Sequence, residues 1–321
     1  MWAAQFDRRK QMISNIVSLP LPVNETFNIK KNTFSNEEGK RICIVTGTHG
    51  DELEGQYACF LVAQRLKNEM EHLRGTVEIY PATNPLGIDS INRSIPVFEL
   101  DMNRTFPGDP EGSMVEFSAA RIIEDIRGAD MVLDIHASNI YLTEMPQIRI
   151  NQLHEDVLLP WARRANVDFI WVHGASTVLE STFAYSLNST GTPCLVVEMG
   201  VGMRLTEEYG RQICDGIFNI MKEMGMWDGD TAPVREPIVS DDPDEVVFLN
   251  APTSGMFMKV KSHGSWVRKG ETVGYIFDPL TGEIKEYINA SKSGLLFTVR
   301  EYPLVDEGSL MGRILVKERN R

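Results

Sequence analysis

The sequence contains no apolar run that could cross a membrane, because no stretch approaches the roughly 18 consecutive apolar residues that a bilayer requires. Its first stretch, MWAAQFDRRKQMISN, carries charges where a signal peptide would need apolar residues. The sequence therefore predicts a cytoplasmic protein with no membrane partner.

Cysteine is also scarce. The four cysteines, at positions 43, 59, 194 and 214, are scattered and form no CxxC pair. This spacing argues against a disulfide framework and against a cysteine metal site, and it predicts reduced, structural thiols.

Basic residues are fewer than acidic residues. Lysine and arginine number 32 against 45 acidic residues, which gives a formal net charge of -13. Phosphate backbones and acidic lipids are not attracted to such a surface. We therefore expect neither nucleic acid nor an anionic membrane as a partner.

What the sequence does contain is a short apolar run, residues 41–46 (RICIVT), which predicts a buried strand and leads into THGDELEG. His49 and Glu52 come after the run, three residues apart, so their side chains can point to a common centre from one turn. A catalytic zinc usually takes three protein ligands and keeps a fourth position for water. The pair predicts part of a metal site that needs one more ligand from elsewhere.

Two further apolar runs each lead to a side chain that could bind a metal ion or act as a base. Residues 131–135 lead into His136, the best candidate for the third ligand, and residues 193–198 end in Glu198. Open α/β sheets place their ligand sites at the carboxyl ends of the strands. We therefore expect these side chains and the His49 pair to lie together at one edge of a sheet.

Predicted strands and amphipathic helices alternate from residue 41 to residue 224, after two antiparallel edge strands over residues 12–34. This alternation predicts an α/β fold with a mixed, mainly parallel sheet and helices on both faces. Residues 82–114 show no sustained period and are dense in Asn, Pro, Gly and Asp, which indicates a structureless but functional segment. The polar connection over residues 173–192 is expected to lie over the mouth of the site.

The composition and the hydrophobic pattern of the sequence change near residue 228. Residues 228–245 are rich in Asp and Pro, as in a linker, and the chain from there to its end has short apolar runs without a helical period. Two similar segments, NAPTSGMF at 250–257 and NASKSGLLF at 289–297, indicate an internal repeat that resembles a biotinyl/lipoyl-like hammerhead. We predict a catalytic domain over residues 1–228 and a smaller all-β domain over residues 229–321.

Four motifs occur in a specific order, namely THGDELEG, ELDMNRTFPG, LDIHAS and VVEMG. With them the chain resembles the succinylglutamate desuccinylase/aspartoacylase family, a branch of the zinc carboxypeptidase-like hydrolases. The resemblance extends over roughly residues 35–225 and includes the β-domain that such proteins often append.

The resemblance implies one zinc ion per chain and a role for each motif residue. Glu198 would be the general base, and Arg93 would polarise the scissile carbonyl. Asn103 and Arg104 would hold a substrate carboxylate, for which the planar fork of an arginine is well suited. The zinc ligands would be His49, Glu52 and His136.

Other polar residues near these motifs have open roles. Asp51 and Asp134 adjoin the ligands and are candidates either for orienting an imidazole or for ordinary turn hydrogen bonds. The remaining histidines have no partner pattern and are expected to be structural or on the surface; they are His72, His154, His173 and His263.

Three functions compete. The first is a zinc-dependent amidohydrolase that deacylates an N-acyl amino acid or a similar small amide bearing a carboxylate. The second is a metallocarboxypeptidase, which the same residues would serve, and the third is a metal-free protein that binds a carboxylate. The sequence does not distinguish the acyl group or the amino acid. Apolar Met and Phe side chains in the β-domain are compatible with a homo-oligomer.

Overall fold

The computed structural model describes residues 10–96, 98–174 and 180–317. The α-helices of these residues are α1 (Glu54–Asn68), α2 (Pro85–Ser90), α3 (Met114–Ile126), α4 (Glu155–Ala162), α5 (Phe183–Asn188) and α6 (Glu207–Glu223). None of the helices in the described part of the chain is both long and apolar enough to cross a membrane.

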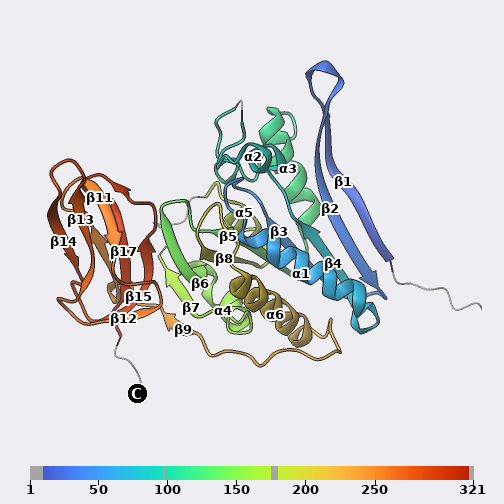
Figure 1. The fold of residues 1–321 in the computed structure, drawn as a ribbon. Coiled ribbons are helices and arrows are strands. Elements are labelled where there is room, and N and C mark those ends of the chain that lie inside the picture. Colours follow the sequence, from blue (N-terminus) through green and yellow to red (C-terminus); the bar gives the residue numbers. More distant parts are fainter. Residues whose placement is uncertain (1–9, 97, 175–179, 318–321) are drawn as a thin grey trace, which may run out of the picture.

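The strands form two sheets (Figure 1). The main sheet comprises β1 (Lys10–Pro20), β2 (Thr26–Asn36), β3 (Arg41–Thr46), β4 (Gly75–Tyr80), β5 (Met131–Ala137), β6 (Leu142–Asn151), β7 (Phe169–His173), β8 (Cys194–Gly200), β9 (Ile238–Ser240), β10 (Val246–Asn250), β12 (Ser265–Val267), β15 (Gly294–Arg300) and β17 (Leu310–Leu315). The second sheet comprises β11 (Gly255–Lys259), β13 (Thr272–Asp278), β14 (Glu283–Asn289) and β16 (Leu304–Val305).

The centre of the main sheet is parallel. β3 pairs in parallel with β4 on one side and with β5 on the other, and β5 pairs in parallel with β8. The β1–β2 hairpin adds antiparallel strands beside β4, and β6 pairs antiparallel with β8. This arrangement confirms the predicted mixed sheet with antiparallel strands before β3, although only β1 lies at the edge, because β2 pairs with β1 on one side and with β4 on the other.

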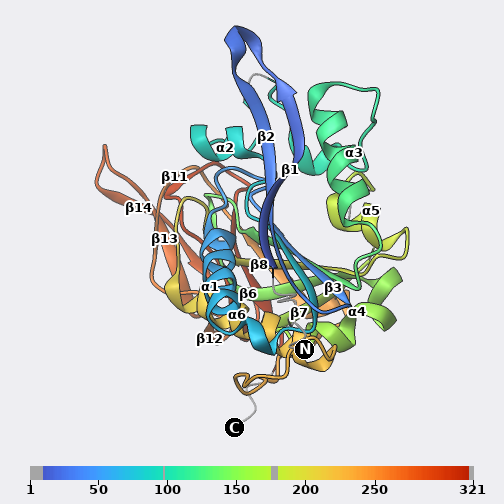
Figure 2. The ribbon, with the colours of Figure 1, turned by 90° about the vertical axis from the view of Figure 1, so that its right-hand side faces the viewer.

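Helices cover both faces of the sheet, as predicted (Figure 2). Buried side chains of α1, α4 and α6 belong to one hydrophobic core, and those of α3 and α5 belong to a second core. β5 lies between the two cores and is buried along its whole length, which explains why its sequence, MVLDIHA, is a nearly continuous apolar run. The two polar residues in that run, Asp134 and His136, therefore need partners in the interior.

The C-terminal strands continue the main sheet. After an irregular segment, β9 pairs in parallel with β7, and β15 pairs antiparallel with β6. The predicted all-β character of this part is confirmed, and the four strands of the second sheet pack on it around a separate core. The division at residue 228 stays a prediction, because hydrogen-bonded pairing joins the strands on either side of it.

Each of the two segments predicted as irregular contains a short helix. Residues 82–114 are not wholly irregular, since they contain α2, in which Pro85 occupies the first turn and the side chain of Asn84 accepts a hydrogen bond from the Gly87 N–H. A helix of six residues is too short to show a period. In the connection 173–192, the structure places α5, while residues 175–179 lie outside the described residues.

Candidate active site

The candidate metal ligands come from the carboxyl ends of two neighbouring parallel strands. The turn after β3 carries His49 and Glu52, and His136 lies near the end of β5. The turn packs so closely that a Cβ added at Gly50 would lie 1.9 Å from the carbonyl carbon of Gly87. One donor atom of each candidate lies within 4.8 Å of the other two, so the fold assembles the predicted triad.

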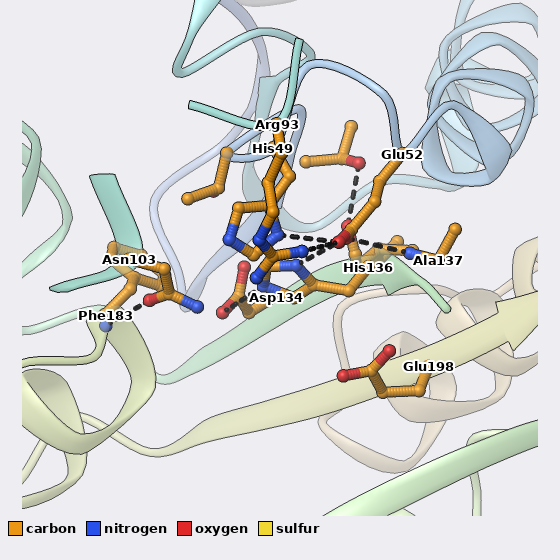
Figure 3. A network of polar contacts seen from close by, with 12 residues as sticks. His49, Glu52, Arg93, Asn103, Asp134, His136, Ala137, Phe183 and Glu198 are labelled. Atoms are coloured by element: carbon orange, nitrogen blue, oxygen red, sulfur yellow. Dashed lines mark hydrogen bonds and ion pairs between the residues drawn. The ribbon is translucent and has the colours of Figure 1, made fainter. Parts of the chain in front are cut away.

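The carboxylate of Glu52 contacts both imidazoles (Figure 3). Its Oε1 is 2.8 Å from Nδ1 of His49, and its Oε2 is 2.9 Å from Nδ1 of His136. The backbone N–H of Ala137 donates to Oε2 over 3.2 Å and fixes the carboxylate further. Both Nδ1 atoms and the carboxylate thus converge on one buried centre.

The opposite nitrogen of each imidazole faces an aspartate. Nε2 of His49 is 3.0 Å from Oδ1 of Asp101, and Nε2 of His136 is 3.1 Å from Oδ2 of Asp134. A carboxylate at Nε2 holds a proton there, so Nδ1 is the nitrogen that can bind a metal ion once it is deprotonated, which is the usual arrangement around metal-binding histidines. Sequence reasoning named Asp134 as a candidate but missed Asp101, whose one signal was its place two residues before Asn103.

Asp51 does not join this arrangement. No hydrogen bond or ion pair links its carboxylate to either imidazole in the described part of the chain, and its Oδ1 is buried without a hydrogen-bond partner there. Its neighbour Glu52 points to the centre instead. Of the two aspartates that adjoin the ligands, only Asp134 therefore orients an imidazole.

The donor set fits a divalent metal ion. Nδ1 of His49 lies 2.8 Å from Oε1 of Glu52, yet it makes no hydrogen bond of acceptable geometry within the described residues. Two donor atoms that lie this close with no well-formed hydrogen bond between them are expected for two ligands of one cation. Two imidazoles and one carboxylate also match the three-ligand set of catalytic zinc sites.

The protonation of the triad reflects these contacts. Burial alone would lower the pKa of His49 and of His136, but the carboxylates of Glu52, Asp101 and Asp134 outweigh it and raise both pKa values above the ordinary range. Burial alone would raise the pKa of Glu52, but the two imidazoles hold it well below its ordinary value. The centre thus keeps a carboxylate charge in the interior, where it attracts cations.

Arg93 approaches the triad from the loop after α2. Its Nη1 donates to Oε1 of Glu52 over 2.8 Å, and its Nη2 donates to Oδ2 of Asp101 over 3.3 Å. About a third of the side chain, 38%, remains exposed. The structure therefore brings Arg93 to the metal-site carboxylates, with part of the guanidinium open to the cavity.

Asn103 and Arg104 lie in a short 3-10 helix, η3 (Met102–Arg104), that the side chain of Asp101 caps. The backbone N–H of Phe183 donates to Oδ1 of Asn103 over 2.9 Å, which turns the amide nitrogen away from α5 (Figure 3). Arg104 donates to the backbone carbonyl of Asn103 over 2.7 Å and forms no ion pair within the described residues. Both side chains offer donors that are free to meet an anion.

Glu198 sits on β8 directly opposite His136 in the parallel register, but apart from the triad (Figure 3). Its ion-pair partner is Arg149, whose Nη1 is 3.1 Å from its Oε1. Burial raises the pKa of Glu198 above its ordinary value, although Arg149 and His136 act in the opposite direction. Burial and a place on the strand next to His136 are features of a carboxylate that can accept and give up a proton.

One cavity of about 460 Å³ joins these groups. All seven predicted site residues line it, namely His49, Glu52, Arg93, Asn103, Arg104, His136 and Glu198. Sequence reasoning missed several other lining residues, which come from β6, β7 and the C-terminal strands: Arg149, Trp171, Phe248 and Arg313. No local motif marked them, because only long-range strand pairing brings them here.

The remaining histidines divide into two groups. His72 is paired with Asp228 and His263 with Tyr209, away from the cavity, as expected for structural residues. His154 and His173 line the cavity, and whether they are only structural or surface residues stays a prediction. The four cysteines are free and buried, which confirms the prediction of reduced thiols.

The chain is similar in sequence to known proteins. Residues 38–224 match the family model described as the succinylglutamate desuccinylase/aspartoacylase catalytic domain. The chain is 27% identical over 279 residues to the N-alpha-acetyl-L-2,4-diaminobutyric acid deacetylase of Halomonas elongata, covering 83% of this chain and 79% of the relative.

Solved structures share the fold. A succinylglutamate desuccinylase/aspartoacylase from Rhodobacter sphaeroides is 26% identical, with a TM-score of 0.79 over 98% of this chain and 99% of that chain. A metallo-carboxypeptidase from Burkholderia cenocepacia is a more distant fold neighbour, with a TM-score of 0.53 and 15% identity over 69% of this chain and 65% of that one. The predicted carboxypeptidase-like fold is thereby confirmed.

Proposed function

Because the chain belongs to the succinylglutamate desuccinylase/aspartoacylase family, we propose that it is a zinc-dependent amidohydrolase. It removes the acyl group from an N-acyl amino acid or from a similar small amide that carries a carboxylate. One observation carries the proposal: a single cavity is lined by a His/Glu/His triad, by a further buried carboxylate, and by an arginine without an ion pair within the described residues.

His49, Glu52 and His136 would hold the zinc ion. When bound, zinc supplies a Lewis acid that activates water and polarises a carbonyl oxygen. The aspartates Asp101 and Asp134 keep each imidazole in the tautomer whose Nδ1 faces the metal position.

Glu198 is the proposed general base. It takes a proton from the attacking water and returns it to the nitrogen of the leaving amine. Its burial and raised pKa suit a group that must both accept and give up a proton. Arg93 offsets the negative charge that develops on the carbonyl oxygen, a type of contact that is worth roughly 3 to 4 kcal/mol for a single donor.

Asn103 and Arg104 bind the substrate carboxylate. Arg93, Arg149 and Arg313 also line the cavity, but each is paired with a protein carboxylate. Arg104 forms no such pair among the residues that the structure describes, so its guanidinium remains available to a substrate anion. The amide nitrogen of Asn103 adds a neutral donor beside it.

The size of the cavity favours a small substrate. A volume of about 460 Å³ suits a small molecule and is enclosed in part by Phe248 and Arg313 from the C-terminal strands. The relative from Halomonas elongata is named for the deacetylation of an N-acetyl amino acid. A compartment that keeps the four buried cysteines reduced, the cytoplasm, is part of the same proposal.

The test is an assay of amine release by the zinc-loaded protein. The panel contains N-acetyl, N-succinyl and N-formyl amino acids beside short peptides with free C-termini. We expect turnover of one acyl amino acid class, and a loss of kcat of about 100- to 10,000-fold in Glu198→Gln. The exposed Glu71→Gln is the matched control and should behave as the parent does.

Each other outcome changes the proposal in a defined way. Trimming of peptides with the same dependence on Glu198 would replace the deacylase with the carboxypeptidase. Acyl amino acid turnover that survives Glu198→Gln would remove Glu198 from the mechanism. A protein that binds no zinc and turns over nothing would be a carboxylate-binding protein instead.

A further inference from the structure

The carboxylate of Glu198 is tied to the neighbouring strand rather than to the triad. Nη1 of Arg149 on β6 donates to Oε1 of Glu198 over 3.1 Å. This is the one ion pair of Glu198 in the described part of the chain. The direction in which the carboxylate points therefore depends on where Arg149 is held.

Arg149 is held by a second carboxylate. Its Nη2 donates to Oε2 of Glu144 over 2.8 Å. Its Nε is buried and has no hydrogen-bond partner within the described residues. The guanidinium is thus fixed through its two terminal nitrogens, one on Glu144 and one on Glu198.

Glu144 in turn depends on the C-terminal strands. It is completely buried, and β15 pairs with β6 so that Thr298 lies opposite Glu144. Thr298 donates its hydroxyl to Oε1 of Glu144 over 3.0 Å, and Nη1 of Arg313 on β17 donates to the same oxygen. A buried carboxylate without such donors would be costly, so these strands stabilise Glu144 in place.

Arg313 is itself well fixed. Its guanidinium carbon lies 5.9 Å from the centre of the Trp171 ring and 5.7 Å from that of Phe248. Its Nε is buried and, within the described residues, has no hydrogen-bond partner. The two rings and Glu144 leave the guanidinium little freedom to move.

The four charged groups alternate in sign along a chain of contacts: Glu198, Arg149, Glu144 and Arg313. One end lies on β8 beside the metal-ligand triad, and the other end lies on β17. Without Arg313, Glu144 would lose half of its positive partners, and Arg149 would be drawn toward it and away from Glu198. Through these contacts, the C-terminal strands influence the geometry of the proposed base.

We propose that Arg149 is a positioning residue for Glu198, and that Arg313, acting through Glu144, makes the C-terminal strands part of the catalytic apparatus. The inference rests on the proposed function, because it takes Glu198 as the base. It assigns the C-terminal part a role beyond that of covering the cavity.

The first test compares steady-state kinetics of zinc-loaded variants on the best acyl amino acid. We expect Arg149→Met to lower kcat about 100-fold with KM nearly unchanged, since displacement of a reacting group by about 1 Å has such an effect. Arg313→Met should lower kcat about tenfold by the same displacement, transmitted through Glu144. Arg149→Lys should restore part of the loss.

A combination of variants tests whether Arg313 acts through Arg149. In the Arg149→Met background, adding Arg313→Met should change kcat by less than about twofold, whereas independent sites would multiply their effects. Arg300→Met is the matched control: Arg300 is a buried arginine of β15 that contacts Tyr141 and backbone carbonyls but does not line the cavity. A loss of kcat in Arg300→Met equal to that in Arg313→Met, or multiplicative losses in the double variant, would overturn the proposal.

A second measurement does not depend on activity. Crystal structures of the parent and of Arg313→Met should show the contact between Arg149 and Glu198 present in the first and broken in the second. If the contact persists in the variant, the positioning role is wrong. Should Arg313→Met fail to fold, Arg313→Lys replaces it, because it keeps the charge and loses the planar fork. A parent that turns over no acyl amino acid would refute the proposed function, while the structures would still decide whether the charges are coupled.

Discussion

At the scale of single residues, Asp101 connects two parts of the site. One carboxylate oxygen accepts from the backbone N–H of Asn103 and lies 3.0 Å from Nε2 of His49, and the other accepts from Arg93. The same side chain thus orients a metal ligand and begins the segment that carries the proposed carboxylate donors. It is the residue whose loss should affect metal binding without removing a ligand.

We expect Asp101→Asn to weaken zinc binding about 10- to 100-fold, because the amide can no longer hold the proton on Nε2 as a carboxylate does. Competition with a chromophoric chelator measures the affinity. Asp51→Asn is the control, since Asp51 precedes the ligand Glu52 but its carboxylate pairs with neither imidazole, and its Oδ1 lacks a hydrogen-bond partner within the described residues. Equal losses in the two variants would show that orientation of His49 by Asp101 is not the cause.

Arg104 allows a separate prediction about substrate binding. Arg104→Met should raise KM about 10- to 100-fold with little change in kcat, because the charged hydrogen bonds to the substrate carboxylate are lost. Arg104→Lys should fall between parent and Met, since an ammonium group cannot form the bidentate contact. Arg163→Met, at a half-exposed arginine paired with Glu236, is the control. An unchanged KM in Arg104→Met would place the carboxylate elsewhere.

Four of the seven predicted site residues share one property, whereas Arg93, Asn103 and Arg104 were predicted only from the family resemblance. His49, Glu52, His136 and Glu198 each follow or end an apolar strand, so the local pattern and the rule for parallel sheets place them together. Asp101 and Arg149 carry no such pattern. The first reaches its partner through an irregular loop, and the second through the antiparallel pairing of β6 with β8, which no local period encodes.

At the scale of elements, a polar cluster ties β2, β3 and β4 to α3. Glu78 on β4 accepts from Lys31 on β2 over 2.7 Å and from Arg41 on β3 over 2.9 Å. Asp125 on α3 accepts from the same lysine. Burial alone would raise the pKa of Glu78, but these two cations outweigh it and lower the pKa below its ordinary value.

Replacing Glu78 by Gln should therefore destabilise the fold by about 3 to 5 kcal/mol at neutral pH, because both cations lose their buried partner. A depressed pKa stabilises the folded state above the unfolded pKa of about 4.3, and this contribution is lost as the pH falls through the folded-state value. The difference in unfolding free energy between parent and variant should shrink in acid. Urea denaturation at neutral pH and at about pH 3 measures it.

Glu124→Gln on the exposed side of α3 is the matched control. Glu124 pairs with Arg121 on the surface, so its loss should change the free energy of unfolding by less than about 1 kcal/mol at either pH. A variant of Glu78 that behaves in the same way would mean that the cluster does not stabilise the sheet.

Element prediction succeeded where elements were long and periodic. The expected amphipathic helices are present as α1, α3 and α6, which are 13 to 17 residues long, and the apolar runs 41–46, 131–135 and 193–198 correspond to β3, β5 and β8. α2 was missed because its boundary signals, Asn84 and Pro85, stand in a segment where Asn and Pro also mark turns. β6 contains Pro146 and a register shift between Glu144 and Gln147, which break its alternation of apolar and polar residues.

At the scale of the whole molecule, the sequence indicated a change of composition near residue 228. It did not indicate how the chain before residue 228 contacts the chain after it. The pairing of β15 with β6 joins residues more than 150 positions apart, as in Thr298 opposite Glu144. No local sequence pattern marks the pairing of strands that are so far apart in the chain. The contribution of Arg313 and Phe248 to the cavity could therefore be learned only from the structure.

Metal binding should couple to the stability of the whole chain in a pH-dependent way. Carboxylates raise the pKa of His49 and His136, although burial opposes this. In the metal-free protein, these raised values stabilise the fold fully below about pH 6.5, and the contribution is lost as the pH rises through the folded-state pKa. Zinc binding must release the same protons. For each proton released, the affinity of the protein for zinc rises about tenfold per pH unit.

We therefore expect the gap in thermal midpoint between zinc-loaded and chelated protein to widen from about pH 6 to about pH 8. At free zinc about 1,000-fold above Kd, the stabilisation should reach about 4 kcal/mol. His72→Asn, at a histidine paired with Asp228 outside the cavity, should leave the gap unchanged, whereas His136→Asn should abolish it. A gap that narrows with rising pH would mean that zinc does not compete with protons for these imidazoles, and that the triad is not the metal site.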